Sequence, residues 1–299
     1  MASILPRSST TPELSSSQVL ISDSHYDPTY GLLPSHHFQN HRRFTRFLED
    51  SFKNFERDNN QQYVMVGGVT EKIIDWLDAN HRRLPPMRLC YDDPTGKLII
   101  KFVSRRHERL HTQLMFIICE QLRNMGLEFN EFVVEGAGRQ QGNNSRQKEP
   151  DNSFCPTNTR PNKDDCSTLV IEAGLSEGLN KLRNDAHFWL TQTNERIKIV
   201  ILIHGSIDRK IITIERWQNV SHPRPQRTRS ANPAKRPTRI QQLTIMKPND
   251  SPPIVTNAPL ILPLSEIFDT KPPRIMQDEI SLPDSVLEQY AGAFFLTLP

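Results

Sequence analysis

The chain has 299 residues, of which 36% are hydrophobic and 23 are prolines, and this composition predicts one folded core with long irregular arms. Its net charge of +3 is too small to indicate a nucleic-acid partner by itself, and four scattered cysteines without a CxxC pair indicate neither a disulfide framework nor a cysteine zinc site. Since the chain contains no apolar run of membrane-spanning length and no secretory signal, we expect a soluble intracellular protein, cytoplasmic or nuclear, without a membrane partner.

The N-terminal third divides into a tail and a helical region. Residues 1–24 are rich in Ser, Thr and Pro, which predicts a disordered tail. We expect residues 25–94 to form a helical extension, with a strand at 63–66 and a helix at 69–79. Its first helix begins at His41 and has on one face Phe44, Phe47, Leu48, Phe52 and Phe55. This helix either packs on the core or acts as a basic arm on phosphate, because arginines alternate with the apolar residues.

Residues 95–217 are expected to form the core, starting with a strand at 97–103 and a helix at 105–125. The helix contains His107, Glu108 and His111, which match HExxH, a motif whose two histidines bind zinc and whose glutamate acts as base. A zinc metalloprotease is therefore a remote alternative, with Glu131 as a third ligand. The arginines around the motif oppose a metal, and a charged first helical turn is the simpler interpretation.

Two carboxylates stand out in the stretch 148–203. Asp151 opens a short strand and Glu172 closes an apolar run, so a hairpin across the connector 156–166 would place both at one sheet edge. Two such carboxylates repel each other unless a divalent cation lies between them, and hard oxygen ligands suit Mg²⁺ or Mn²⁺.

A helix and a buried strand follow Glu172. An apolar stripe with Ser176 as its candidate cap predicts the helix, and its members are Leu175, Leu179, Leu182, Ala186 and Trp189. The run 197–203 is apolar except for Lys198 and predicts a strand buried on both faces. Strand, helix and strand together predict a right-handed crossover between parallel strands.

This arrangement resembles the PD-(D/E)XK nuclease-like superfamily, and within it the Uma-type endonuclease-like proteins and their fungal relatives. The residues that carry the resemblance are Glu149, Pro150, Asp151, 169–174, Ser176, Glu177, Leu182, Asp185 and Trp189. It covers about residues 95–217. The resemblance implies an α/β fold in which helices flank a mixed sheet. It also implies a metal site formed by Asp151, Glu172 and the backbone carbonyl of Ala173.

The function implied by this resemblance is metal-dependent cleavage of DNA or RNA, with DNA the favoured partner and a homodimer left open. The superfamily lysine normally stands two residues after the glutamate, where this chain has Gly174. Lys181 on the following helix is the candidate third catalytic residue, or it pairs with Asp185 one turn on. A catalytically silent protein that binds nucleic acid or another partner through the same fold is the alternative.

The C-terminal part contains a charged segment between two strands. Residues 210–217 and 240–246 predict strands that pair across 218–239, a basic, proline-rich loop able to attract phosphate. Residues 240–299 are expected to form an extension that packs back on the core and ends in a helix at 282–290, with Asp284 as its cap.

Overall fold

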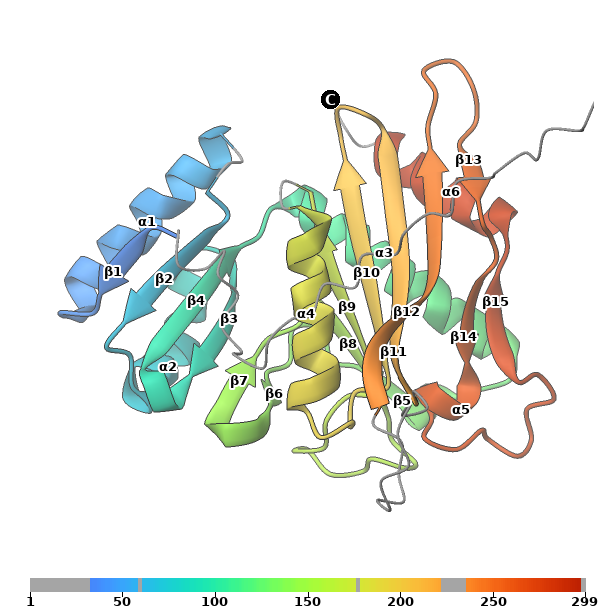
Figure 1. Cartoon of the computed structure of the whole chain (residues 1–299), viewed down its shortest axis with the longest axis horizontal. Helices are drawn as coiled ribbons and strands as arrows, with labels where there is room; N and C mark the ends of the chain where they lie inside the picture. The colour runs from blue at the N-terminus through green and yellow to red at the C-terminus, as the bar shows by residue number, and fades with distance from the viewer. Residues whose placement is uncertain (1–32, 59–60, 176–177, 222–234, 297–299) are drawn as a thin grey trace, which may run out of the picture. The chain divides into compact units, whose positions relative to one another are not determined.

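The computed structural model of the chain describes residues 33–58, 61–175, 178–221 and 235–296 (Figure 1). The predicted tail at 1–24, the predicted cap Ser176 and residues 222–234 of the predicted loop lie outside these ranges. Within them the chain forms two mixed sheets with helices packed against them, which confirms the predicted α/β class. None of the described helices is long and apolar enough to cross a bilayer.

The first sheet has the order β1-β2-β4-β3-β7-β6, with β1 and β2 parallel and the other pairs antiparallel. Its strands are β1 (Ser35–His37), β2 (Tyr63–Gly67), β3 (Met87–Asp92), β4 (Lys97–Phe102), β6 (Gln140–Gln141) and β7 (Arg146–Lys148). Helices α1 (His41–Asp58) and α2 (Glu71–Asn80) pack against it, because Phe44 and Leu77 share one buried cluster with Leu98 and Ile100. The predicted boundary near residue 95 falls between the paired strands β3 and β4. The segment predicted as a helical extension therefore supplies strands to this sheet.

The second sheet has the order β13-β12-β11-β10-β9-β8-β5, in which β9 and β10 are parallel and the other pairs antiparallel. Its strands are β5 (Phe132–Val134), β8 (Asn152–Pro156), β9 (Leu169–Gly174), β10 (Ile199–Ser206), β11 (Ile211–Ser221), β12 (Lys235–Met246) and β13 (Ile254–Thr256). The predicted pairing across the basic segment is confirmed by β11 and β12. Both strands extend into 218–239, so the two ends of the predicted loop are strand.

Helices cover both faces of this sheet, with α4 (Leu179–Gln192) in front and α3 (Arg105–Asn124) behind in Figure 1. The crossover from β9 through α4 to the parallel strand β10 is as predicted. Along β10, Ile199, Ile201 and Ile203 belong to the cluster on the α3 face, and Val200 and Leu202 to the cluster on the α4 face. The strand is therefore buried on both faces, because its alternate side chains meet two apolar layers.

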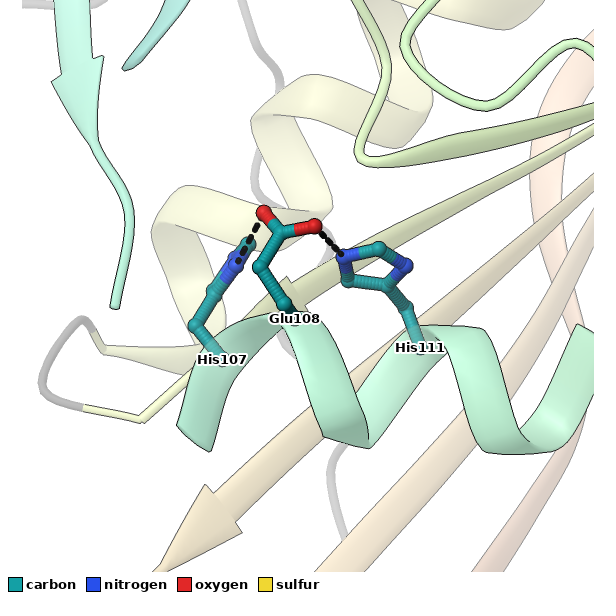
Figure 2. A group of neighbouring side chains, drawn as sticks. All are labelled: His107, Glu108 and His111. Atoms are coloured by element: carbon teal, nitrogen blue, oxygen red, sulfur yellow. Dashed lines mark ion pairs between the residues drawn. The ribbon is translucent and has the colours of Figure 1, made fainter. Parts of the chain in front are cut away.

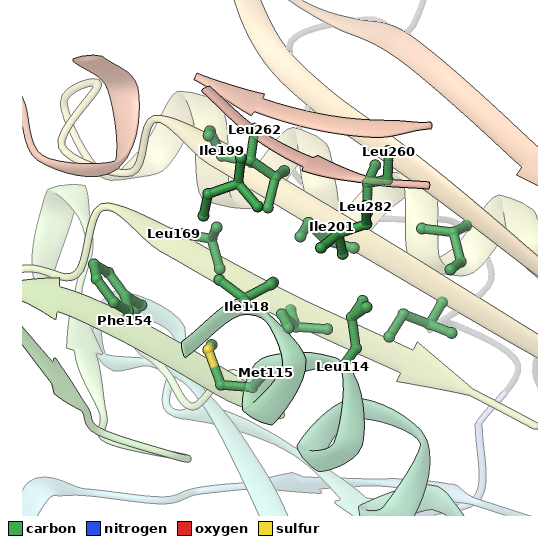
Figure 3. Packing of buried hydrophobic residues seen from close by; sticks show 14 of the residues in the cluster. Leu114, Met115, Ile118, Phe154, Leu169, Ile199, Ile201, Leu260, Leu262 and Leu282 are labelled. Carbon is green, nitrogen blue, oxygen red and sulfur yellow. The ribbon is translucent and has the colours of Figure 1, made fainter. Parts of the chain in front are cut away.

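The C-terminal elements extend the core on the α3 face. They are β14 (Leu260–Pro263), α5 (Leu264–Ile267), β15 (Glu279–Leu282) and α6 (Asp284–Leu296). Figure 3 shows Leu260, Leu262 and Leu282 of β14 and β15 above side chains of α3 and the second sheet. The Tyr290 hydroxyl of α6 donates to the Leu110 carbonyl of α3 at 2.8 Å. Short 3-10 helices in the connections span His81–Arg83, Asp93–Thr95, Phe129–Glu131 and Asn143–Ser145.

Candidate active site

The pairing of β8 with β9 brings the two predicted carboxylates together. These strands are antiparallel, with Asn152 opposite Ile171, so Asp151 lies beside the end of β9, where Glu172 stands. The backbone amide of Ala173 donates to Asp151 Oδ2 at 2.7 Å, which fixes that carboxylate against the strand. Both acids are almost completely buried, with 1% of Asp151 and 2% of Glu172 exposed. They lie at one sheet edge, as the hairpin interpretation predicts.

The Lys101 ammonium lies where the oxygen atoms of this edge converge. Its Nζ donates to Asp151 Oδ2 and to the carbonyl oxygen of Ala173, each at 2.8 Å, and lies 3.8 Å from Glu172 Oε2. Lys101 comes from β4, whose alternate residues Leu98 and Ile100 belong to the buried cluster between the first sheet and helices α1 and α2. The three groups that the resemblance names as metal ligands therefore surround one positive charge.

Glu172 has two further partners on the α4 side. Trp189 Nε1 donates to Glu172 Oε1 at 2.7 Å, and the Lys148 ammonium of β7 lies 3.2 Å from the same oxygen. Lys148 also donates to Asp185 of α4. Burial alone would lower the pKa of Lys148, but Asp185 and Glu172 outweigh it and raise the pKa. Lys148 is thus a buried cation held between two carboxylates.

The pKa values of the two acids are shifted in opposite directions. Burial raises the pKa of Glu172 to about 7. Burial acts in the same direction on Asp151, but His107 and Lys101 outweigh it and hold the pKa of Asp151 well below its usual range. Asp151 is therefore ionised at neutral pH, whereas Glu172 exchanges a proton close to neutrality.

His107 of α3 completes the surroundings of Asp151. Its Nε2 lies 3.1 Å from Asp151 Oδ2 and 3.0 Å from the Ala173 carbonyl oxygen. The side chain is positioned because His107 stands in the first turn of α3, where its backbone amide donates to the capping hydroxyl of Ser104 at 3.3 Å. The residues of the HExxH match thus adjoin the carboxylate edge.

A pocket of about 460 Å³ opens at the start of α3. Its lining residues are Pro86, Arg88, Val103, Ser104, Arg105, Glu108 and Arg109. Arg88 connects the pocket to the buried acids, because its Nε lies 3.8 Å from Asp151 Oδ1 and its Nη2 donates to Glu108 Oε1 at 2.6 Å. Oδ1 of Asp151 is buried and has no hydrogen-bond partner among the described residues.

The predicted third residue, Lys181, lies elsewhere. Its ammonium is placed over the Tyr63 ring, while the ammonium groups at the carboxylates belong to Lys101 and Lys148. Asp185, the alternative partner predicted for Lys181, accepts from Lys148. This placement has a physical cause: the two carboxylates face strands of the first sheet, which the local sequence after Glu172 does not reveal.

Sequence reasoning missed Lys101 and Lys148 as members of the site. The sequence gives a sign of Lys101, because it lies within the apolar run of β4. A lysine buried in such a strand requires a carboxylate or another anionic partner. Lys148 lies three residues before Asp151 and had no such signal. Glu131, the suggested third zinc ligand, accepts from Arg274. Among the described residues, the group that could hold a metal ion consists of His107, Glu108 and His111 without it.

Comparison with known proteins finds likenesses among solved structures. A scan of protein-family models and a search of curated proteins find no match. Among solved structures, the chain is similar to a protein of Anabaena variabilis that belongs to DUF820 and is proposed to be a nuclease, with 12% identity and a TM-score of 0.38. The likeness covers 71% of this chain and 97% of that one.

Proposed function

We propose that this chain is a metal-dependent nuclease with a restriction-endonuclease-like core. The observation that carries the proposal is the convergence of Asp151 Oδ2, Glu172 Oε2 and the Ala173 carbonyl oxygen on the Lys101 ammonium. These are the two acids and the carbonyl that the sequence motif names as ligands. The register of β8 and β9 supports the same grouping independently of the motif.

A divalent cation fits this donor set. The three oxygens already face one cationic point, and Asp151 Oδ1 adds a buried acceptor without a hydrogen-bond partner in the described part of the chain. All are hard donors of the kind that Mg²⁺ and Mn²⁺ prefer. Such an ion would polarise a phosphodiester and lower the pKa of the attacking water. Lys101 would be the catalytic lysine in place of Lys181, donating a hydrogen bond to the phosphate or to that water.

The basic pocket supports an anionic substrate. Arg88, Arg105 and Arg109 line it together with Ser104 at the N-terminus of α3, where backbone amides and the helix dipole favour negative charge. Since Arg88 also lies beside Asp151, a phosphate bound there would be next to the acids. DNA and RNA both offer this group, and the resemblance favours DNA.

A second candidate function follows from the burial of the site. Because Lys101 Nζ already occupies the point on which the oxygens converge, it can replace the ion permanently, as an internal cation. The chain would then be a catalytically silent relative that binds nucleic acid through its basic pocket. In that case the carboxylates serve the fold and not the chemistry.

The test is cleavage of labelled single-stranded and duplex DNA and RNA by the purified full chain with Mg²⁺ or Mn²⁺. Asp151→Asn, Glu172→Gln and Lys101→Met are compared with Lys97→Met, which removes a partly exposed lysine from the start of the same strand. We expect cleavage that requires the metal, is lost in the first three variants by about 100-fold or more, and is retained in Lys97→Met.

Other outcomes would decide against this proposal. If Lys181→Met abolishes cleavage and Lys101→Met does not, the lysine assignment is wrong. If the folded protein cleaves none of the substrates but binds them with an affinity that falls with salt and with loss of Arg105, the silent alternative holds.

A further inference from the structure

Three side chains in the first two turns of α3 converge on one point next to the carboxylate site. Figure 2 shows the Glu108 carboxylate between the rings of His107 and His111. His107 Nδ1 lies 3.7 Å from Glu108 Oε1, and His111 Nε2 lies 3.4 Å from Oε2. One ligand atom from each residue lies within 4.8 Å of the other two.

The two imidazole nitrogens that face Glu108 are buried and unsatisfied. His107 is 1% exposed and His111 2% exposed. Within the described residues, neither Nδ1 of His107 nor Nε2 of His111 has a hydrogen-bond partner. A buried polar group without a partner costs about 1–3 kcal/mol. Two such nitrogen atoms that face the same carboxylate therefore indicate that a cation binds between them.

The outer partners of the histidines orient them for coordination. His107 Nε2 lies 3.0 Å from the Ala173 carbonyl oxygen, which can only accept, so Nε2 carries the hydrogen. In the neutral ring Nδ1 then has its lone pair toward Glu108. His111 Nδ1 lies 3.4 Å from both Thr112 Oγ1 and Asn152 Nδ2, which hold the other side of that ring. Histidines that bind metals typically have their second nitrogen held in this way.

We propose that His107, Glu108 and His111 bind one transition-metal ion, with zinc preferred. Two imidazoles and one carboxylate suit zinc and not magnesium. Metal–ligand distances of roughly 2.0–2.2 Å allow ligand atoms up to about 4.3 Å apart, so a small closure of the side chains completes the site. Glu108 can make this movement, because 41% of its side chain is exposed and it lines the basic pocket. A fourth position for water or an anion opens toward that pocket.

The proposed site differs from a zinc protease site in the role of Glu108, and its charge is balanced by Arg88. Glu108 is a ligand and therefore not a free base, so the site does not provide proteolytic chemistry. Arg88 donates to Glu108 Oε1 at 2.6 Å and leaves Oε2 for the ion, so the arginine balances charge without blocking the site. Through His107, the zinc ligand also touches the Ala173 carbonyl of the carboxylate edge.

The experiment titrates the metal-stripped full chain with Co²⁺ and then displaces it with Zn²⁺. We expect the visible absorption of a low-coordinate cobalt site, distinct from any ion held by the oxygens of Asp151 and Glu172, to saturate with one ion and to be lost on addition of zinc. Glu108→Gln and His111→Asn should each weaken binding by at least about 100-fold, the upper end of the cost of losing an outer-shell partner. Glu120→Gln, at an exposed glutamate of the same helix, is the matched control and should bind as the unaltered chain does.

Three results would overturn the proposal: absence of saturable binding, equal affinity in Glu108→Gln, and loss of binding in Glu172→Gln. The last result would place the ion at Asp151 and Glu172. Glu108→Gln keeps the test valid if His111→Asn fails to fold, since Glu108 is partly exposed and its replacement leaves the buried rings in place. Binding is measured without reference to nucleic-acid cleavage, so the nuclease proposal stands or fails separately.

Discussion

Replacing Lys101 with methionine removes the ammonium that lies between two buried carboxylates. Methionine keeps much of the apolar stem but donates nothing to Asp151 or to the Ala173 carbonyl. Removing one partner of a buried ion pair typically costs 3–5 kcal/mol. Because His107 and the Ala173 amide still hold Asp151, we expect a loss of about 3 kcal/mol, a large share of the 5–15 kcal/mol typical of a domain.

The same substitution should make stability depend on divalent cations. With the ammonium gone, the three oxygens can take Mg²⁺ without displacing a charge. An ion at 100 times its dissociation constant adds about 2.7 kcal/mol, which would restore most of the loss. In the unaltered chain Mg²⁺ competes with Lys101 Nζ, so its stabilising effect should be smaller.

The assay is urea unfolding of both proteins with and without Mg²⁺, with Lys97→Met as the control. Lys97→Met should lower the free energy of unfolding by less than Lys101→Met does, because Lys97 is only partly buried. If Lys101→Met costs less than about 1 kcal/mol, the ammonium does not hold the acids. If Mg²⁺ does not stabilise the variant, the oxygens do not form a divalent site.

Further predictions concern Glu172 and the core. Burial raises the pKa of Glu172 from its ordinary 4.5 to about 7, so the folded protein favours the protonated acid. The protonated Glu172 therefore stabilises the fold fully below pH 4.5, and this stabilisation is lost as the pH rises through about 7. Urea unfolding across this range should show a decline of up to about 3 kcal/mol that Glu172→Gln lacks, and an equal decline in the variant would refute this. Trp189→Phe removes the indole donor to Glu172 Oε1, so it should raise the pKa of Glu172 further and lower the free energy of unfolding by about 1–3 kcal/mol. Carboxyl NMR titration measures the pKa and urea unfolding measures the stability. An unchanged pKa would contradict the hydrogen bond. Phe154→Ala should leave a cavity in the cluster of Figure 3 and cost about 3–5 kcal/mol, whereas Phe116→Ala, at a side chain 66% exposed, should cost little; equal thermal shifts in the two variants would be inconsistent with this packing.

Long elements with strong periodicity could be predicted from the sequence. The helices beginning at His41 and Arg105 follow from apolar residues at helical spacing, and the structure has them at His41–Asp58 and Arg105–Asn124. The strand β3 was not anticipated, because Met87–Asp92 alternates weakly and is defined by its pairing with β4 and β7. Its position within a sheet is set by distant partners and not by its own residues.

The sequence by itself determined that Asp151 and Glu172 share an edge. Once β8 and β9 pair across residues 157–168, the two-residue period of strands leaves little freedom in their register. It also determined the crossover to β10, because a strand buried on both faces is marked by its own composition.

The tertiary structure alone decided which cations meet these acids. Lys101 is 50 residues before Asp151 and belongs to the other sheet, so no local pattern connects them. Lys181 is close in sequence to Glu172, but its helix directs it to Tyr63. The physical reason is that buried carboxylates attract whichever cation the packing of sheets and helices brings within reach, and that choice is made only when distant elements come together.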